Sequence, residues 1–445
     1  STVDEDGLRE VISAEAHAAR DRLDPDGGRM VSAVWFDAGP GRAGRLLVLI
    51  HHLVVDGVSW RILLDDLETA YHQISSGRPV DLEPKTTTYQ HWAQRLAEHV
   101  RIGGLDDELA YWAEASGRVP VELPVDRVGS NTVDAARTLS VRLGCDDTDA
   151  LLHQVPEVYR TQVNDVLLSA LGRVLARWTG HDRVLIGMEG HGREEIFDDI
   201  DTSRTIGWFT TEFPVALDLP ADQDWGAVLK SVKEQLRAMP HRGLSYGALR
   251  YLSPPDSPAG ILHDDPLPQI SFNYHGQWDV AVAEEGFYRA RGDAIGQNAA
   301  GHSVRSCLLD IIGQVENGEL ELAWSYSSQV HDEATVQRLA IEMIQALREI
   351  IEHCVQPGAG GRTPFDFPLT CLDQSTVDRI VGDGRSVEDI YPLTPMQAGM
   401  LFHNLVDSSS GAYLDQVCLR LSGLSDPHAL GMAWQRVVDR TPILR

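Results

Sequence analysis

Hydrophobic positions recur along the chain at two spacings, and their alternation predicts a mixture of helices and strands. Spacings of three and four residues predict helices over residues 5–23, 58–75, 86–100, 105–114, 161–178, 225–237 and 332–353. Short apolar or alternating runs predict strands over residues 29–37, 45–51, 137–143, 183–188, 213–217, 307–314 and 320–326. A Gly-rich turn at 39–41 joins the first two strands, and Asn317-Gly318 predicts a tight hairpin between the last two. This mixture indicates an α/β or α+β architecture.

The pattern breaks at residues 357–361, where Pro and Gly accumulate. We interpret this break as a domain edge and predict three parts: a domain over 1–356, a linker with one short helix over 357–388, and the start of a second domain over 389–445. In the second domain we expect a strand at about 412–421 and a helix at about 426–438.

Composition narrows the class of protein. The 445 residues carry 38 basic and 66 acidic side chains, a net charge of −28, which disfavours binding to nucleic acid or to an anionic membrane. No apolar run reaches the ~20 residues of a transmembrane helix. The 5 scattered cysteines form neither a disulfide framework nor a metal knuckle, which favours a reducing cytoplasm. Because the chain opens without Met or a signal peptide, we expect it to be part of a longer polypeptide.

The candidate chemistry starts with two adjacent histidines, His51 and His52, between the strand at 45–51 and the helix predicted from Val58. An imidazole can take up a proton near neutrality and return it. Adjacent residues of a strand point to opposite faces, so only one of the pair can face a given cavity. No Cys or His follows at the spacing of metal ligands, and we predict no metal site. Two histidines at a strand end can also be purely structural.

The segment HHLVVDGVSWRIL (51–63) resembles the His-His-x-x-x-Asp-Gly signature of the condensation superfamily of nonribosomal peptide synthetases. Four later segments are similar to the same family, in its order: EGHGRE (189–194), RTIGWFTTEFP (204–214), PHRGLSYG (240–247) and FNYHGQW (272–278). The Val-Ser-Trp continuation of the first segment, with EGHGRE and FNYHGQ, resembles the epimerization branch. Residues 391–403 resemble the opening of a condensation domain, and 363–390 resemble its usual connector. Both domains look incomplete.

The resemblance implies a fold of two chloramphenicol-acetyltransferase-like lobes forming a V, with the histidine motif at the floor between them. It implies epimerization, from L to D, of the α-carbon of an aminoacyl or peptidyl thioester during nonribosomal peptide synthesis. The substrate would arrive on the phosphopantetheine arm of an upstream peptidyl carrier domain, and a condensation domain would follow in the same polypeptide. The domain itself would bind no cofactor.

This reaction needs a base that removes the α-hydrogen, stabilisation of the enolate, and an acid on the other face. The resemblance assigns the acid and base roles to His52 and Glu189, which would face each other across a tunnel. An apolar tunnel would raise the pKa of the carboxylate toward the working range. Which of the two removes the proton stays open, as does one group doing both; Glu189 in a solvated Gly-rich loop is the structural alternative.

Four residues are expected to orient the site or bind the substrate. Asp56 is expected to be structural rather than catalytic, binding turn amides or pairing with an arginine that fixes the histidine loop. Arg193 is either that partner or polarises the thioester oxygen, and a surface position is the alternative. Ser59 opens the helix near negative charge or caps it. His51 flanks the catalytic histidine.

Three aromatic or amide side chains complete the predicted site. Asn273 and Tyr274 end a strand and are expected to donate hydrogen bonds to the enolate or the bound peptide, with Tyr274 counted among the catalytic residues. Alternatively they satisfy buried backbone groups. Trp208 is expected in the tunnel wall or the core.

A local basic cluster stands out in this acidic chain, formed by Arg237, His241, Arg242 and Arg250. We predict that this region, through Arg237 and Arg242 above all, docks the acidic carrier or its phosphate; ordinary solvated charge is the alternative.

Two other functions fit the same motif. A peptide-bond-forming condensation domain, or a related acyltransferase, would use the histidine to help an amine or hydroxyl attack a thioester. A non-catalytic carrier-binding module is the third possibility.

Overall fold

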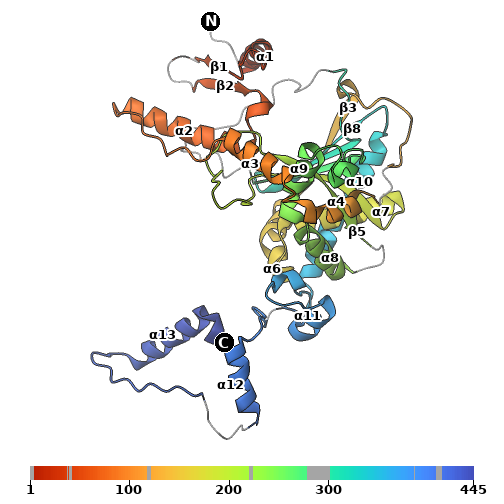
Figure 1. The fold of residues 1–445 in the computed structure, drawn as a ribbon. Helices are drawn as coiled ribbons and strands as arrows, with labels where there is room; N and C mark the ends of the chain where they lie inside the picture. The colour runs from red at the N-terminus through yellow and green to blue at the C-terminus, as the bar shows by residue number, and fades with distance from the viewer. Residues whose placement is uncertain are drawn as a thin grey trace. The chain divides into compact units, whose positions relative to one another are not determined.

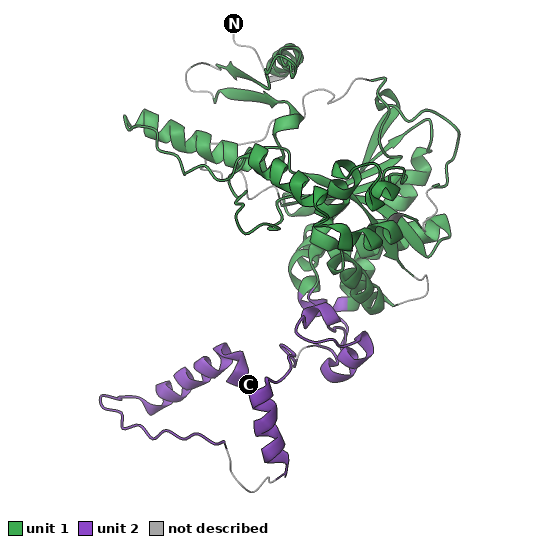
Figure 2. Ribbon diagram, in the orientation of Figure 1, with its two compact units in different colours: residues 1–156, 161–353 green, residues 157–160, 354–445 purple. Residues whose placement is uncertain are grey.

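A computed structural model gives the fold and describes residues 5–37, 39, 43–117, 122–219, 224–277, 301–384, 386–406 and 413–444. The chain divides into two compact units (Figure 2). The first contains residues 1–156 and 161–353, and the second contains residues 157–160 and 354–445. None of the helices in the described ranges combines the length and the apolar character that crossing a bilayer requires.

The first unit is organised around a six-stranded sheet of order β3-β8-β7-β6-β4-β5 (Figure 1). Its strands are β3 (Ala136–Leu143), β4 (Arg183–Gly190), β5 (Thr211–Asp218), β6 (Ile270–Gln277), β7 (Leu309–Glu316) and β8 (Glu319–Ser327). The pairs β4–β6 and β6–β7 are parallel, and the other three pairs are antiparallel. The carboxyl ends of β4, β6 and β7 therefore lie at the same edge of the sheet.

The hairpin between β7 and β8 follows the prediction from its sequence. Asn317 and Gly318 both adopt left-handed backbone conformations, with φ of 52° and 77°. Two consecutive positive φ angles match the right-handed twist of paired strands, and Asn-Gly tolerates them best. The turn sets the register that places Glu316 opposite Glu319.

One face of the sheet forms the core of the first unit. Strand residues on this face alternate with partly exposed ones, and Phe272, Ile311 and Leu322 are completely buried. The helix α7 (Val163–Thr179) packs against β4, and α8 (Trp225–Arg237) packs against both β5 and α7. The helix α10 (Glu333–Cys354) is joined to α8 by a hydrogen bond from Trp225 Nε1 to Glu349 Oε2, 3.2 Å long. Figure 1 shows these three helices grouped beside the sheet.

The other part of the first unit carries the histidine motif. Strands β1 (Val31–Phe36) and β2 (Arg45–Ile50) form an antiparallel hairpin, and α1 (Glu5–Asp21) packs on both. After β2 come the 3₁₀ turn η1 (His52–Val54) and the helix α2 (Gly57–Ser75). Of the Gly-rich turn predicted at 39–41, Pro40 and Gly41 lie outside the described residues.

Further helices link these parts. They are α3 (Tyr89–Arg101), α4 (Leu109–Gly117), α5 (Cys145–Asp149), α6 (Val155–Tyr159) and α9 (Leu244–Leu252). The helix α9 packs on β5 and α3, and α4 also contacts β5. The helices and strands predicted before residue 356 are all present, with ends shifted by a few residues, and the mixed α/β architecture is confirmed. The sequence analysis missed α5, α6 and α9.

The second unit contains α11 (Gln374–Val381), α12 (Pro395–Val406) and α13 (Pro427–Arg440). The short helix predicted in the linker is α11, and the linker has a small core of its own, made by Phe367, Val377 and Val381. The strand predicted at 412–421 is wrong, because described residues 413–421 have no regular structure. An isolated extended segment leaves its backbone groups without partners, and no described strand lies in this unit to supply them.

Candidate active site

The two histidines at the end of β2 have different surroundings. His51 caps η1, since its Nδ1 accepts a hydrogen bond of 3.2 Å from the Leu53 amide. His52 is exposed, and its Nδ1 lies 2.8 Å from the Val55 carbonyl oxygen. A carbonyl oxygen can only accept, so Nδ1 carries the proton and Nε2 of the neutral ring keeps its lone pair. This geometry presents His52 Nε2 as the free base and leaves His51 a structural role.

The Asp56 carboxylate, 3 % exposed, anchors the histidine loop. It caps α2 by accepting a hydrogen bond of 2.7 Å from the Ser59 amide, and it accepts a second hydrogen bond of 3.1 Å from the Phe209 amide. Arg193 Nη2 lies 3.2 Å from both carboxylate oxygens. Arg193 and Phe209 lie 137 and 153 positions after Asp56 in the sequence. The Asp56 side chain therefore connects the start of α2 to two distant segments of the chain.

Arg193 acts as the orienting partner in this structure. Its Nη1 donates to the carbonyls of Thr202 and Thr205 at 2.8 and 2.7 Å, and its guanidinium carbon lies 4.0 Å from the centre of the Phe209 ring. Burial lowers the pKa of Arg193, and the nearby Asp56 carboxylate opposes that change. Both terminal nitrogens are engaged by protein groups, so the arginine holds the loop rather than facing a substrate oxygen.

Ser59 joins the same network from α2. Its hydroxyl lies 3.0 Å from the Gly207 carbonyl and 3.1 Å from both the Gly207 amide and Arg193 Nη2. A Cβ at Gly207 would meet the Tyr89 ring at 2.3 Å, which explains a glycine there. The predicted helix-opening position of Ser59 is confirmed, although Asp56 supplies the cap.

Gly192 lets the EGHGRE segment make this turn. Its φ is 66°, and a Cβ at this position would lie 1.7 Å from the Phe209 carbonyl oxygen. No side chain fits so close to a backbone oxygen, and left-handed backbone is itself costly for other residues. Gly192 thus brings Arg193 to Asp56.

Trp208 lies beside the predicted base. The His52 and Trp208 ring centroids are 3.9 Å apart, at an interplanar angle of 55°. Two hydrogen bonds hold Trp208 in place. Its Nε1 donates to the Thr210 carbonyl oxygen at a distance of 3.0 Å, and its own carbonyl oxygen accepts from Tyr89 Oη at 2.8 Å. The indole is half-buried, as expected of a wall residue, and it restricts the His52 ring.

Glu189 is the penultimate residue of β4, at the carboxyl edge of the parallel strands. Its carboxylate is solvent-accessible but surrounded by protein, and the largest cause of its raised pKa is desolvation. The negative charges of Glu212 and Asp310 raise the pKa further, and His52 in its protonated form lowers it. The structure therefore brings His52 and Glu189 within electrostatic reach, although 136 residues lie between them (189 − 52 − 1).

Asn273 and Tyr274 occupy different surroundings on β6. Asn273 Nδ2 donates to Glu189 Oε2 at 2.6 Å. Tyr274 is the next residue and turns to the other face of the sheet, where its ring and Leu322 approach the same side of Gly313. No described contact joins Tyr274 to Glu189 or His52, and its hydroxyl has no hydrogen-bond partner among the described residues. Trp278, the last residue of this segment, lies outside the described residues.

The predicted basic cluster is not one surface. Arg237 is bidentate to the buried Asp165 at 3.1 and 2.8 Å. Arg250 is buried, and it donates to Tyr246 Oη and to the carbonyls of residues 263 and 265. The structure therefore does not support carrier docking through Arg237, because the buried Asp165 already binds its guanidinium group. Arg250 is likewise held by protein groups. Arg242, 75 % exposed and 3.9 Å from Glu194, extends into solvent.

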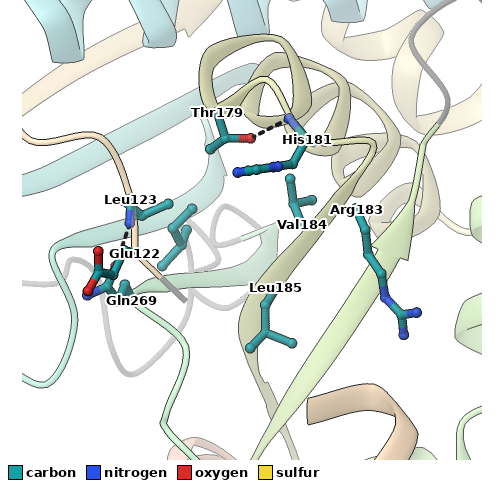
Figure 3. Close-up of a pocket in the computed structure, with 9 residues that line it drawn as sticks. Glu122, Leu123, Thr179, His181, Arg183, Val184, Leu185 and Gln269 are labelled. Carbon is teal, nitrogen blue, oxygen red and sulfur yellow. Dashed lines mark hydrogen bonds between the residues drawn. The ribbon is translucent and has the colours of Figure 1, made fainter. Parts of the chain in front are cut away.

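A separate pocket lies at the opposite end of the parallel strands (Figure 3). Its lining includes Thr179, His181 and Arg183 at the junction of α7 and β4, and also Leu123 and Gln269. Arg183 precedes Glu189 by six positions on β4, or about 20 Å at ~3.3 Å per residue. None of the predicted site residues lines this pocket. Among the described residues, no group of three or more His, Cys, Asp or Glu side chains could hold a metal ion.

Several contributors to the site escaped the sequence analysis. Thr205 binds Arg193, Gly207 binds Ser59 and Phe209 binds Asp56, yet only Trp208 was singled out from their segment. The glycine was the available signal, because a glycine between bulky residues indicates a close approach. Glu212 was overlooked because its position opposite Glu189 depends on the strand register.

The comparisons with known proteins identify the family of this chain. The family described as "Condensation domain" matches residues 8–363 and 387–445. A linear gramicidin synthase of Brevibacillus parabrevis is 44% identical over 448 residues, covering 100% of this chain and 6% of that protein. Bacitracin synthase 1 of Bacillus licheniformis is 37% identical over 421 residues, covering 94% of this chain and 8% of that protein. The chain thus spans less than a tenth of the length of these relatives.

Two solved structures illustrate the structural likeness. The crystal structure of the epimerization domain from the third module of tyrocidine synthetase B has a TM-score of 0.71 and 36% identity, covering 79% of this chain and 78% of that one. The X-domain from teicoplanin biosynthesis has a TM-score of 0.59 at 20% identity, covering 80% of this chain and 78% of that one. The second likeness concerns the fold alone.

Proposed function

This chain belongs to the condensation-domain family of nonribosomal peptide synthetases and has its chloramphenicol-acetyltransferase-like fold, and from that premise we propose that it is an epimerization domain. Its reaction would invert the α-carbon of an aminoacyl or peptidyl thioester, from L to D. The thioester would be carried on the phosphopantetheine arm of an upstream peptidyl carrier domain. A condensation domain beginning near residue 389 would receive the product.

The observation that carries this proposal is the convergence of His52 and Glu189. An imidazole with a free Nε2 and a carboxyl group with a raised pKa lie within electrostatic reach of each other. A two-base inversion uses two proton-transfer groups acting on one carbon, and a pKa nearer neutrality lets the carboxyl group exchange protons in either direction. A condensation reaction requires no such second group.

The proposed step conserves atoms and charge. One of the two groups takes the α-proton, and the C–H electron pair moves into the thioester carbonyl to give an enolate. The other group then returns a proton to the α-carbon from the opposite face. The first group keeps the abstracted proton until solvent exchange restores the starting protonation state.

The remaining residues have supporting roles in this proposal. Asn273 positions the Glu189 carboxylate through its bond of 2.6 Å. Asp56 and Arg193 hold the histidine loop, and Trp208 restricts the His52 ring. Tyr274 remains a predicted donor to the enolate or peptide, which Tyr274→Phe tests.

Exchange of the α-proton with deuterated water tests the proposed reaction. The full chain is mixed with a carrier domain bearing an aminoacyl-phosphopantetheine thioester, and the released amino acid is analysed for deuterium and for D/L ratio. We expect deuterium at Cα and both stereoisomers, with both signals abolished by His52→Ala and by Glu189→Gln. His153→Ala, which alters an exposed histidine paired with Asp149, is the matched control and should be active.

The family match favours one rival, peptide-bond formation. That activity would produce a new amide only after an acceptor-loaded carrier is added, with no deuterium at Cα. Such a result would replace the epimerization proposal. Carrier binding with neither product would instead indicate a non-catalytic module.

A further inference from the structure

Two carboxylates face each other at the end of the β4–β5 pair. Glu189 of β4 and Glu212 of β5 are directly opposite in the antiparallel register. Side chains in this relation have Cβ atoms about 4.5–5.5 Å apart, and like charges there are destabilising. Because register fixes this proximity, it does not depend on side-chain rotamers.

Two other cross-strand pairs of this sheet join opposite charges. At the other end of the same pair, Asp218 of β5 is opposite Arg183 of β4, with Nε and Oδ1 3.5 Å apart. On β3 and β8, Arg142 is opposite Glu321, at 2.7 Å. Among the described residues, by contrast, Glu212 makes no hydrogen bond or ion pair. A second like-charged pair, Glu316 opposite Glu319, has a compensating cation, because Arg142 Nη1 lies 3.5 Å from Glu319 Oε2. No described cation pairs with Glu212.

We propose that Glu212 is a positioning residue for the reaction, whose negative charge holds the proton on Glu189 so that this carboxyl group can serve as acid and as base. This inference rests on the proposed epimerization. Glu212 acts through Glu189 and need not touch the substrate. Asp310, on β7, would contribute in the same sense.

The groups around Glu189 support this assignment. After desolvation, Glu212 is the largest cause of the raised pKa of Glu189, followed by Asp310, while His52 acts in the opposite direction. The neighbour on β6, Asn273, is a neutral donor. The turn η5 (Pro240–Gly243) also packs against β4, and its two basic side chains are directed to other carboxylates, His241 to Glu108 and Arg242 to Glu194.

The pH dependence of α-proton exchange, measured in the L-to-D and D-to-L directions with the full chain and a loaded carrier, tests this role. Removing the charge in Glu212→Gln should lower the pKa of Glu189. Where Glu189 is the base, it is then deprotonated at lower pH, so the acidic limb moves to lower pH. Where it is the acid, it loses its proton at lower pH, so the alkaline limb moves to lower pH. The moving limb should therefore differ between the two directions.

Glu212→Lys should move the same limbs further, because it places a positive charge opposite Glu189. It also replaces a repulsive pair by an attractive one, so loss of folding does not explain its effect. Asp218→Asn, at the far end of β5, is the matched control and should leave both profiles unchanged. Unchanged limbs in both Glu212 variants would overturn the inference, whereas absence of exchange in the unaltered chain would reject the proposed reaction itself.

Discussion

Asp56→Asn should destabilise the protein far more than a change of one charge on its surface. The carboxylate accepts bonds from the amides of Ser59 and Phe209 and from Arg193 Nη2. An Asn amide keeps one acceptor and introduces a donor that must face the Phe209 amide or the guanidinium. The charge of Arg193, which is 7 % exposed, is then left uncompensated.

The structure sets the size of this effect. Removing one member of a buried ion pair costs about 3–5 kcal/mol, whereas an exposed pair contributes about 0–1 kcal/mol. A domain has a total stability of about 5–15 kcal/mol, so the variant should lose a large fraction of it. The carbonyl of Val55, which fixes the His52 ring, directly precedes Asp56. A displacement of about 1 Å there should slow α-proton exchange by about 10²-fold.

Urea unfolding followed by tryptophan fluorescence measures the loss of stability, and exchange is assayed where the variant is still folded. Glu342→Gln, which breaks the exposed pair with Arg338, is the control and should change the midpoint little. Arg193→Met added to Asp56→Asn should restore part of the lost stability, because it removes the unpaired charge. A loss below about 1 kcal/mol for Asp56→Asn, as expected of a surface pair, would refute the assigned anchoring role.

Three further predictions address other parts of the site. Gly192→Ala should cost at least about 1–2 kcal/mol from its left-handed backbone, and more from the clash with Phe209, measured by urea unfolding; a neutral result would contradict the close approach. Glu189→Gln should increase stability more at alkaline than at mildly acidic pH. The folded state raises the pKa of Glu189, so folding binds protons and the ionised carboxylate opposes folding above the unfolded pKa; a pH-independent change in unfolding midpoint would argue against this sign. Arg242→Glu should weaken binding of a carrier domain in a salt-dependent way, measured by calorimetry, whereas Arg338→Glu on α10 should not; equal binding by both would remove Arg242 from the docking surface.

Local pattern predicted most of the fold because the elements of the first unit are strongly periodic. It failed for α9, where the segment PHRGLSYG drew attention as a motif and its helical spacing was not read. It also failed at 413–421, where alternation suggested a strand but the second unit supplies no partner among its described residues. A strand is stable only in a sheet, so its local sequence is an incomplete predictor.

The candidate site shows the same division. The pairing of Asp56 with an arginine could be anticipated, because a buried carboxylate in a turn needs donors. The opposite orientations of Asn273 and Tyr274 depend on the pleat of β6, and the dispersal of Arg237 and Arg250 depends on partners far along the chain. Motif spacing contains neither kind of information.

The pairing of β4 with β5 and β6 fixes the face of the sheet on which the Glu189 carboxyl group lies, because successive strand residues point to opposite faces. Met188, beside Glu189, is buried in the core, so deleting a single residue earlier in β4 would place Gly190 where Glu189 now lies and drive the carboxylate into the hydrophobic layer. Removing two residues would preserve the alternation while shortening the reach along the strand. The proposed acid–base role of Glu189 therefore depends on the number of residues that precede it in β4. Insertions and deletions are tolerable only in loops, which can absorb the change in length.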